Sequence, residues 1–89
     1  MEFTDQVHVG ATHEAVDTVM DTNTAAAVGS GSLPVYATPA MAALMERAAA
    51  ELCAAGCPEG WTTVGTEIAI RHKAATPVGL TVRAVAEVT

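Results

Sequence analysis

The sequence has 89 residues, of which 51% are hydrophobic and only 3% aromatic. Residues 1–89 correspond to a single domain. A chain of this size buries only about 60% of its unfolded surface and is marginally stable alone. Association with a second copy would bury more surface and stabilise it. The net charge is −6, with four lysines and arginines in total. This balance argues against a nucleic-acid partner, because phosphate backbones require clustered cations.

The sequence shows no sign of secretion or membrane insertion. The first residues, MEFTDQ, lack the basic and apolar regions of a secretory signal. The alanine-rich stretch Ala40–Leu52 contains three charged residues and is too short to span a bilayer. Cys53 and Cys57 are typical of reduced thiols in the cytoplasm. We therefore expect a cytoplasmic protein with no membrane partner.

The first third of the chain predicts one strand and a loop. Valine and alanine alternate loosely from Gln6 to Met20, which predicts a strand with an interruption near Gly10. The stretch Asp21–Leu33 is poor in large apolar residues and contains the sequence GSGS. Such a composition is typical of a loop or a short helical turn.

The clearest predicted element is a long helix that begins at Thr38-Pro39. A threonine before the helix can cap its free amides, and proline suits the first helical position. Apolar residues then recur at helical spacing: Met41, Leu44, Met45, Ala48 and Leu52. Gly56 and Pro58 predict the end of the helix.

The last third predicts two strands joined by a turn. The run Thr62–Ala74 is rich in β-branched residues, and its alternation places the isoleucines and His72 on one buried face. Thr76–Gly79 predicts a turn, and Leu80–Val88 alternates as a second strand. Strand, loop, long helix and hairpin together predict an α+β domain.

Two long segments resemble the fluoroacetyl-CoA thioesterase family. They are VYATPAMAALMERAA (residues 35–49) and TTVGTEIAIRHKAATPVGLTVRAVAEV (residues 62–88), and the upstream DTNTAAAVGSGSLP fits the same pattern. The resemblance implies a hotdog fold, in which a curved antiparallel sheet wraps a long central helix, here without the last strands of the family. It also implies a homodimer or higher homo-oligomer with sites at the subunit interface, which hydrolyses the thioester of a short acyl-CoA.

The resemblance also implies the site residues. Matching motifs place the catalytic set on Thr38, Glu46 and His72, and place Gly65 against the acyl group. The family enzyme closes its pocket with two phenylalanines in the loop before the helix. The corresponding loop here carries Gly29–Ser32 and no aromatic residue, so the resemblance does not extend to specificity for fluoroacetate.

Each of the three implied catalytic residues suits thioester chemistry. Glu46 can act as a general base or attack the thioester directly, and the sequence leaves both roles open. His72 can transfer a proton near neutral pH. Amides after Thr38 can hold the oxyanion, because a helix start presents unpaired N–H groups. Without the resemblance, we would interpret Thr38 as a helix cap, Glu46 as a solvated carboxylate and His72 as a core residue.

Substrate contacts are expected from Pro39, which follows Thr38, and from Arg71. Arg71, Lys73 and Arg83 are close enough in sequence to bind the phosphates of coenzyme A, or else form a solvated face. Coenzyme A enters as part of the substrate, and no other cofactor is expected. The cysteines and histidines lack the spacing of a zinc site, so we expect no metal.

Two other functions fit the same sequence. The first is a non-catalytic hotdog module that binds acyl-CoA or another small ligand. The second is a structural half-domain that another chain completes.

Overall fold

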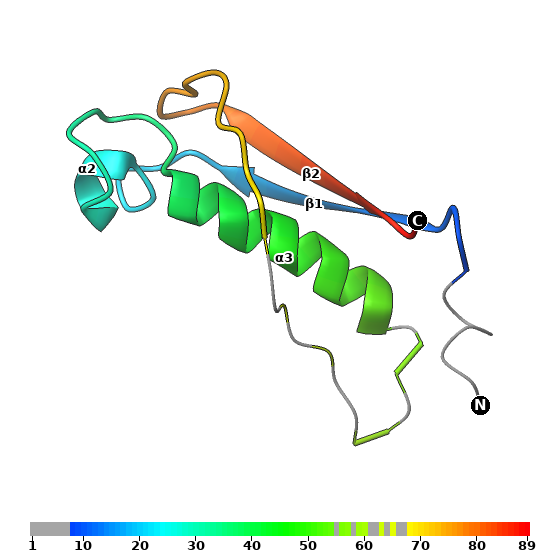
Figure 1. Ribbon diagram of the computed structural model, residues 1–89. Coiled ribbons are helices and arrows are strands. Elements are labelled where there is room, and N and C mark those ends of the chain that lie inside the picture. The colour runs from blue at the N-terminus through cyan, green and yellow to red at the C-terminus, as the bar shows by residue number, and fades with distance from the viewer. Residues whose placement is uncertain (1–7, 55, 58, 61–62, 64, 66–67) are drawn as a thin grey trace.

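The computed structural model describes residues 8–54, 56–57, 59–60, 63, 65 and 68–89. Within these residues the elements are, in chain order, β1 (Thr12–Thr18), α2 (Ala25–Val28), α3 (Thr38–Ala54) and β2 (Thr81–Glu87). Figure 1 shows α3 lying along one face of the sheet that β1 and β2 form, with α2 beyond its first turn. No helix among the described residues has the length and hydropathy needed to cross a membrane.

The sheet pairs two strands from opposite ends of the chain. β1 and β2 are antiparallel, in a register that runs from Thr12 opposite Glu87 to Thr18 opposite Thr81. The strands predicted within Gln6–Met20 and Leu80–Val88 are therefore confirmed, as is the short helical turn before α3. The turn before β2 is also confirmed, with Gly79 at a φ of 100° that glycine adopts without strain.

The core between α3 and the sheet consists mostly of small side chains. Ala15 on β1 and Leu44 and Ala48 on α3 are buried, and three partly buried residues of β2 pack against them: Val82, Ala84 and Ala86. The burial pattern alternates along both strands, so one face of the sheet meets α3 and the other meets solvent. The core is thin because most of the side chains that form it are alanines.

Helix α3 begins one residue earlier than the sequence indicates. The amide of Met41 donates to the carbonyl of Ala37 at 2.9 Å, so Thr38 lies inside the first turn. The prediction that Thr38 precedes the helix as its cap is therefore wrong by one position. Its side chain is consequently available for a contact outside the helix. The helix ends at Ala54, just before Gly56, as predicted.

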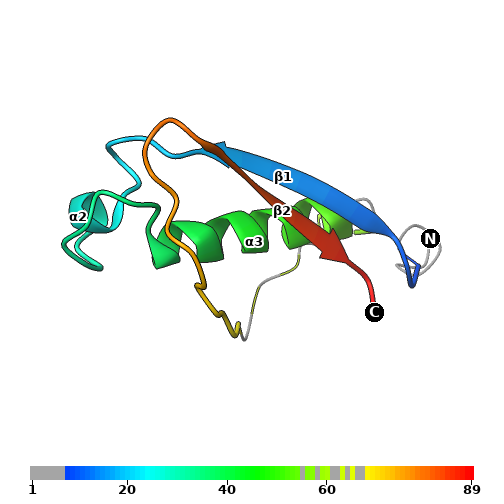
Figure 2. The same cartoon turned by 90° about the horizontal axis from the view of Figure 1, so that it is seen from above.

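The predicted strand Thr62–Ala74 and the predicted hairpin are wrong for the residues that the structure describes. Residues 63, 65 and 68–74 belong to no strand, while 62, 64, 66 and 67 lie outside the described part. A strand needs a hydrogen-bonded neighbour, and β2 pairs with the distant β1 instead. Figures 1 and 2 show the described end of this segment, residues 68–74, running past α3. The expected burial of its isoleucines also fails, since Ile68 is 46% exposed.

Candidate active site

Thr38 and His72 are in direct contact. Thr38 Oγ1 lies 2.7 Å from His72 Nδ1, although the two residues are 34 positions apart in sequence. Thr38 belongs to the first turn of α3, and His72 comes from the segment that runs past this helix. A hydroxyl beside an imidazole is an arrangement suited to moving a proton. The structure therefore brings together two of the three predicted catalytic residues.

Tyr36 connects the segment that carries His72 to the start of α3. The amide of Tyr36 donates to the carbonyl of Thr76 at 2.8 Å, four residues beyond His72. The Tyr36 hydroxyl donates to Asp17 Oδ2 at 2.8 Å on β1, and it also lies 3.1 Å from the carbonyl oxygen of Ala40. The side chain is buried, with 2% exposure. Burial, and then the hydrogen bond and charge of Asp17, raise the pKa of Tyr36.

Asn23 connects Ala37, the residue before α3, to Thr18 at the end of β1. Its carbonyl accepts from the amide of Ala37 at 3.0 Å, and its side-chain amide donates to the carbonyl of Thr18 at 2.9 Å. The side-chain oxygen of Asn23 accepts from the amide of Met20 at 2.8 Å. The sequence pattern alone marks neither Tyr36 nor Asn23 as important. An asparagine after a strand signals a turn, but it does not reveal such distant partners.

Glu46 and Gly65 form a second contact, further along α3. A Cβ built on Gly65 would lie 3.0 Å from Glu46 Oε2 and 3.4 Å from Glu46 Cδ. The absence of a side chain at Gly65 is thus what allows the carboxylate to lie there. Glu46 is exposed in the single chain. Both residues line a cavity of about 790 Å³ beside α3, with small or apolar neighbours that include Ala43, Ala49, Ala50, Cys53 and Ile68.

The two contacts form separate parts of the candidate site. Glu46 follows Thr38 by eight residues, which corresponds to about 12 Å along the axis of an α-helix. Among the described residues, Glu46 makes no polar contact with Thr38 or His72. The chain therefore presents a hydroxyl–imidazole pair at the helix start and a carboxylate–glycine pair near the helix middle.

The start of α3 offers only two free amide donors for an oxyanion, those of Thr38 and Ala40. Pro39 directly follows Thr38 and has no N–H. Because the first helical hydrogen bond runs from Met41 to Ala37, the amides of Thr38 and Ala40 have no acceptor within the helix. Pro39 is exposed beside them and can offer only apolar surface.

The predicted cation cluster is only partly assembled. Arg71 and Lys73 are exposed on either side of His72. Arg83 lies on β2, where its Nη1 is 3.6 Å from Glu14 Oε2 on the outer face of the sheet. An exposed pair of this kind contributes little to stability. Of the three predicted cations, Arg71 and Lys73 are thus the two that directly flank His72 in the sequence.

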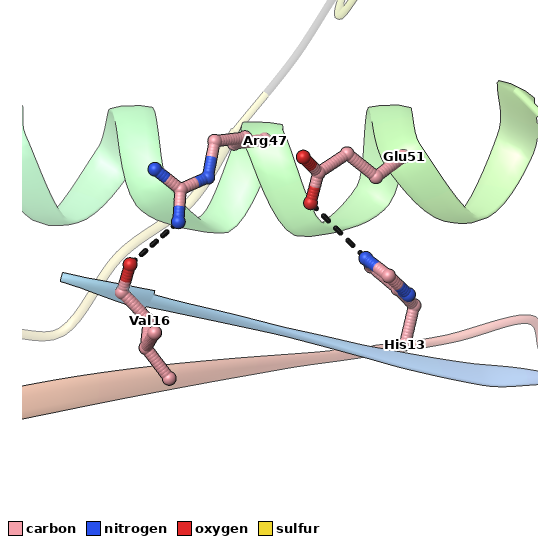
Figure 3. A network of polar contacts seen from close by, with 4 residues as sticks. All are labelled: His13, Val16, Arg47 and Glu51. Atoms are coloured by element: carbon pink, nitrogen blue, oxygen red, sulfur yellow. Dashed lines mark hydrogen bonds and ion pairs between the residues drawn. The ribbon is translucent and has the colours of Figure 1, made fainter.

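Arg47, which no sequence motif marks, attaches α3 to β1. Its Nη2 donates to the carbonyl oxygen of Val16. One turn further along the helix, Glu51 Oε1 lies 3.0 Å from His13 Nε2 on β1. Figure 3 shows both contacts reaching from one side of α3 to the same strand. These residues attach the helix to the sheet, and Arg47 also lines the cavity beside Glu46.

The cysteines are free and half-buried. Cys53 lines the cavity beside Glu46, whereas Cys57 lies beyond the end of α3. Both thiols are thus partly exposed. In the part of the chain that the structure describes, no three histidine, cysteine or acidic side chains gather as a metal site would require.

Comparison with solved structures identifies close structural relatives. The structure of the fluoroacetyl-CoA thioesterase superposes with a TM-score of 0.82 and 33% sequence identity, covering 91% of this chain and 64% of that chain. A threonine-to-serine variant in complex with acetyl-CoA gives a TM-score of 0.83 and 32% identity, covering 91% and 65%. A threonine-to-alanine variant in complex with fluoroacetate gives 0.82 and 32%, with the same coverage.

The chain thus spans about 65% of the length of these relatives. Its long helix against an antiparallel sheet is the arrangement of their hotdog fold. Among curated protein sequences, none matches this chain. The sequence profile of the fluoroacetyl-CoA-specific thioesterases matches residues 19–89, so the chain belongs to this family.

Proposed function

We propose that this protein hydrolyses the thioester of a short acyl-CoA. The contact between Thr38 Oγ1 and His72 Nδ1 at 2.7 Å carries the proposal, because it pairs a hydroxyl with a proton-transfer group at the start of a helix. The family supports the same chemistry. Solved relatives bind acetyl-CoA and fluoroacetate, which supports a small acyl group. Coenzyme A is then part of the substrate, and no further cofactor is needed.

In this mechanism the thioester carbonyl lies at the first turn of α3. The amides of Thr38 and Ala40 stabilise the oxyanion, helped by the partial positive charge of the helix start. His72 transfers a proton to the departing thiolate, and its contact with Thr38 orients the imidazole. Arg71, next to His72 and exposed, binds a phosphate of coenzyme A.

Glu46 acts in one of two ways. As a general base it removes a proton from the attacking water, and as a nucleophile it forms an anhydride that water then opens. Gly65 leaves the space in which the carboxylate meets the acyl group. A single turnover in ¹⁸O-labelled water separates these roles. A nucleophilic Glu46 acquires the label when the anhydride opens at the side-chain carbonyl, whereas a general base leaves all of the label in the free acid.

A homodimer or higher homo-oligomer is part of the proposal. Glu46 lies about 12 Å along the helix from Thr38, so one subunit does not bring the three groups together. A second subunit would complete each site from its own residues. We also propose a cytoplasmic location, supported by the two free cysteines.

The test is a hydrolysis assay with acetyl-, fluoroacetyl-, propionyl- and butyryl-CoA, with release of the free thiol as the readout. Turnover that disappears in His72→Ala would support the proposal. A rate no higher than in buffer, for all four substrates, would reject it.

Acyl-CoA binding without catalysis is the second candidate function. The exposure of Glu46 and its separation from Thr38 and His72 favour this alternative. Calorimetric binding of butyryl-CoA to a chain that shows no turnover would establish it.

A half-domain completed by another chain predicts a different result, namely an unfolded far-UV circular dichroism spectrum for the isolated 89 residues.

A further inference from the structure

The stretch 35–37, which directly precedes α3, is hydrogen-bonded on two sides. On one side the amide of Ala37 donates to the carbonyl of Asn23 at 3.0 Å. On the other side the amide of Tyr36 donates to the carbonyl of Thr76 at 2.8 Å. Extended residues alternate their backbone groups between two sides, so this stretch lies between two neighbouring segments as a central strand does. The start of α3 and the segment that contains Thr76 are therefore joined through Tyr36.

The side chain of Tyr36 attaches this junction to β1. Its hydroxyl donates to Asp17 Oδ2 at 2.8 Å and lies 3.1 Å from the carbonyl oxygen of Ala40, in the first turn of α3. Asp17 belongs to β1, where it pairs with Val82 of β2. A hydrogen-bonded strand pair is a fixed reference for the groups bound to it. The Asp17 carboxylate therefore determines where the hydroxyl, and with it the start of the helix, can lie.

The Tyr36 hydroxyl keeps its proton at neutral and mildly alkaline pH. Burial, and then the hydrogen bond and charge of Asp17, raise the pKa of this phenol above its usual value of about 10. The phenol is thus a hydrogen-bond donor throughout this pH range. Asn23 Nδ2 makes a longer contact of 3.4 Å with the same carboxylate oxygen. Two side chains therefore hold the carboxylate of Asp17 in place.

We propose that Asp17 and Tyr36 are positioning residues for the Thr38–His72 pair. Thr38 follows Tyr36 by two residues. His72 precedes Thr76, which Tyr36 holds, by four residues. The 2.7 Å contact between Thr38 Oγ1 and His72 Nδ1 is then set from β1, through the carboxylate and the phenol hydroxyl. The inference rests on the proposed function only in so far as turnover uses this pair.

Loss of the hydroxyl leaves the ring in place but removes the link to β1. Tyr36→Phe keeps the buried ring and the backbone bond to Thr76, so we expect the fold to persist. The first turn of α3, however, loses its connection to the strand through Asp17. A misplacement of about 1 Å can lower a rate by about 10²-fold, because proton transfer depends on the separation of the reacting groups. The expected effect is therefore on kcat, not on KM.

The first test measures kcat and KM for acetyl-CoA in Tyr36→Phe and Asp17→Ala. Each change is expected to lower kcat about tenfold or more and to change KM less than about threefold. Asp17→Asn keeps a hydrogen-bonding group beside the phenol and is expected to stay within about threefold of the wild-type kcat. Leu44→Val, a change in the core, is the matched control for lost stability. An equal loss of kcat in Leu44→Val would assign the effect to stability and overturn the proposal.

A double variant tests whether Tyr36 acts through the pair. Thr38→Val already lacks the hydroxyl that contacts His72. In this background Tyr36→Phe should lower kcat much less than in the wild type, because residues that act as one unit are not additive. The same fold-loss in both backgrounds would show that Tyr36 acts elsewhere, and would overturn the proposal.

A third test needs no turnover. NMR gives the imidazole nitrogen chemical shifts of His72, with Thr38→Val as the reference for a lost contact. Tyr36→Phe and Asp17→Ala are expected to move these shifts towards the Thr38→Val values, whereas Leu44→Val leaves them unchanged. Such a result supports the positioning role even in a chain that hydrolyses no acyl-CoA, so failure of the proposed function remains distinguishable. Shifts of His72 that stay at their wild-type values in both folded variants overturn the proposal.

Discussion

The hydrogen bond between Thr38 and His72 joins the first turn of a helix to a segment that does not belong to the sheet. Its 2.7 Å length places a hydroxyl and an imidazole in direct contact. Among the described residues, the backbone hydrogen bond nearest to His72 along the chain runs from the amide of Tyr36 to the carbonyl of Thr76. Its length is 2.8 Å. The geometry of the pair therefore depends on the short stretch from Tyr36 to Thr38.

Replacement of His72 by alanine should lower kcat for acetyl-CoA by about 10²-fold or more, the usual contribution of an acid–base group. Thr38→Val removes the hydroxyl that contacts Nδ1, and Thr38→Ser keeps it. We expect the serine variant to retain most of the activity that the valine variant loses. Equal rates in the two variants would show that the hydroxyl has no role in turnover.

Gly65→Ala should impair the carboxylate of Glu46. The new methyl group would lie 3.0 Å from Oε2, so the exposed side chain of Glu46 must move away. We expect kcat to fall about tenfold or more, with little change in melting temperature. Kinetics of Gly65→Ala, Glu46→Gln and their combination provide the measurement. The two effects should not add, because both act on one group. Additive effects would separate Gly65 from Glu46.

Tyr36→Phe removes the hydroxyl that donates to Asp17 and should destabilise the fold by about 2 kcal/mol, as for hydrogen bonds to charged groups. Urea unfolding at neutral pH measures this loss. Leu44→Val, a core change distant from the Thr38–His72 contact, is a matched control. Only Tyr36→Phe should also alter the imidazole nitrogen chemical shifts of His72.

The same tyrosine predicts a pH dependence. Burial and Asp17 raise the pKa of Tyr36, so the folded chain holds this proton more tightly than the unfolded chain. The stabilising effect is complete below the unfolded pKa of about 10 and is lost as the pH rises above it. Urea unfolding between pH 8 and 11 should show a decline above pH 10 that is weaker in Tyr36→Phe. An identical decline in both proteins would contradict this assignment.

Arg47→Met should cost about 1 kcal/mol, because it removes the hydrogen bond to the Val16 carbonyl and keeps much of the side-chain length. The neighbouring contact between Glu51 and His13 is exposed at both ends. We therefore expect Glu51→Gln to change stability by less than about 0.5 kcal/mol. Thermal unfolding of the two variants compares the contacts directly. A larger loss in Glu51→Gln would reverse their ranking.

The elements with strong local signals were predictable from sequence. The spacing of Met41, Leu44 and Ala48 predicts a helix because apolar side chains must share one face. Alternation in residues 80–88 predicts a strand for the equivalent reason. α3 begins one residue earlier than predicted, at Thr38, whose hydroxyl contacts the distant His72, and local sequence does not specify that contact.

Strand pairing was not predictable in the same way. The β-branched run from Thr62 to Ala74 has the local pattern of a strand, but strand formation depends on a partner that sequence does not specify. β2 pairs with β1 across the whole length of the chain. The distance between Glu46 and Thr38 follows from helix geometry alone, whereas the contact of Gly65 with Glu46 depends on how the chain returns after α3.

The alanines between α3 and the sheet determine how closely the helix approaches the strands. Ala48 is 1% exposed and Ala15 is 4% exposed, so neither position has spare volume. A larger side chain at either one would lift the helix away from the strands. Thr38 and Glu46 would move with the helix, whereas His72 and Gly65 lie outside it. Side-chain size in the core thereby sets the spacing on which any chemistry of this chain depends.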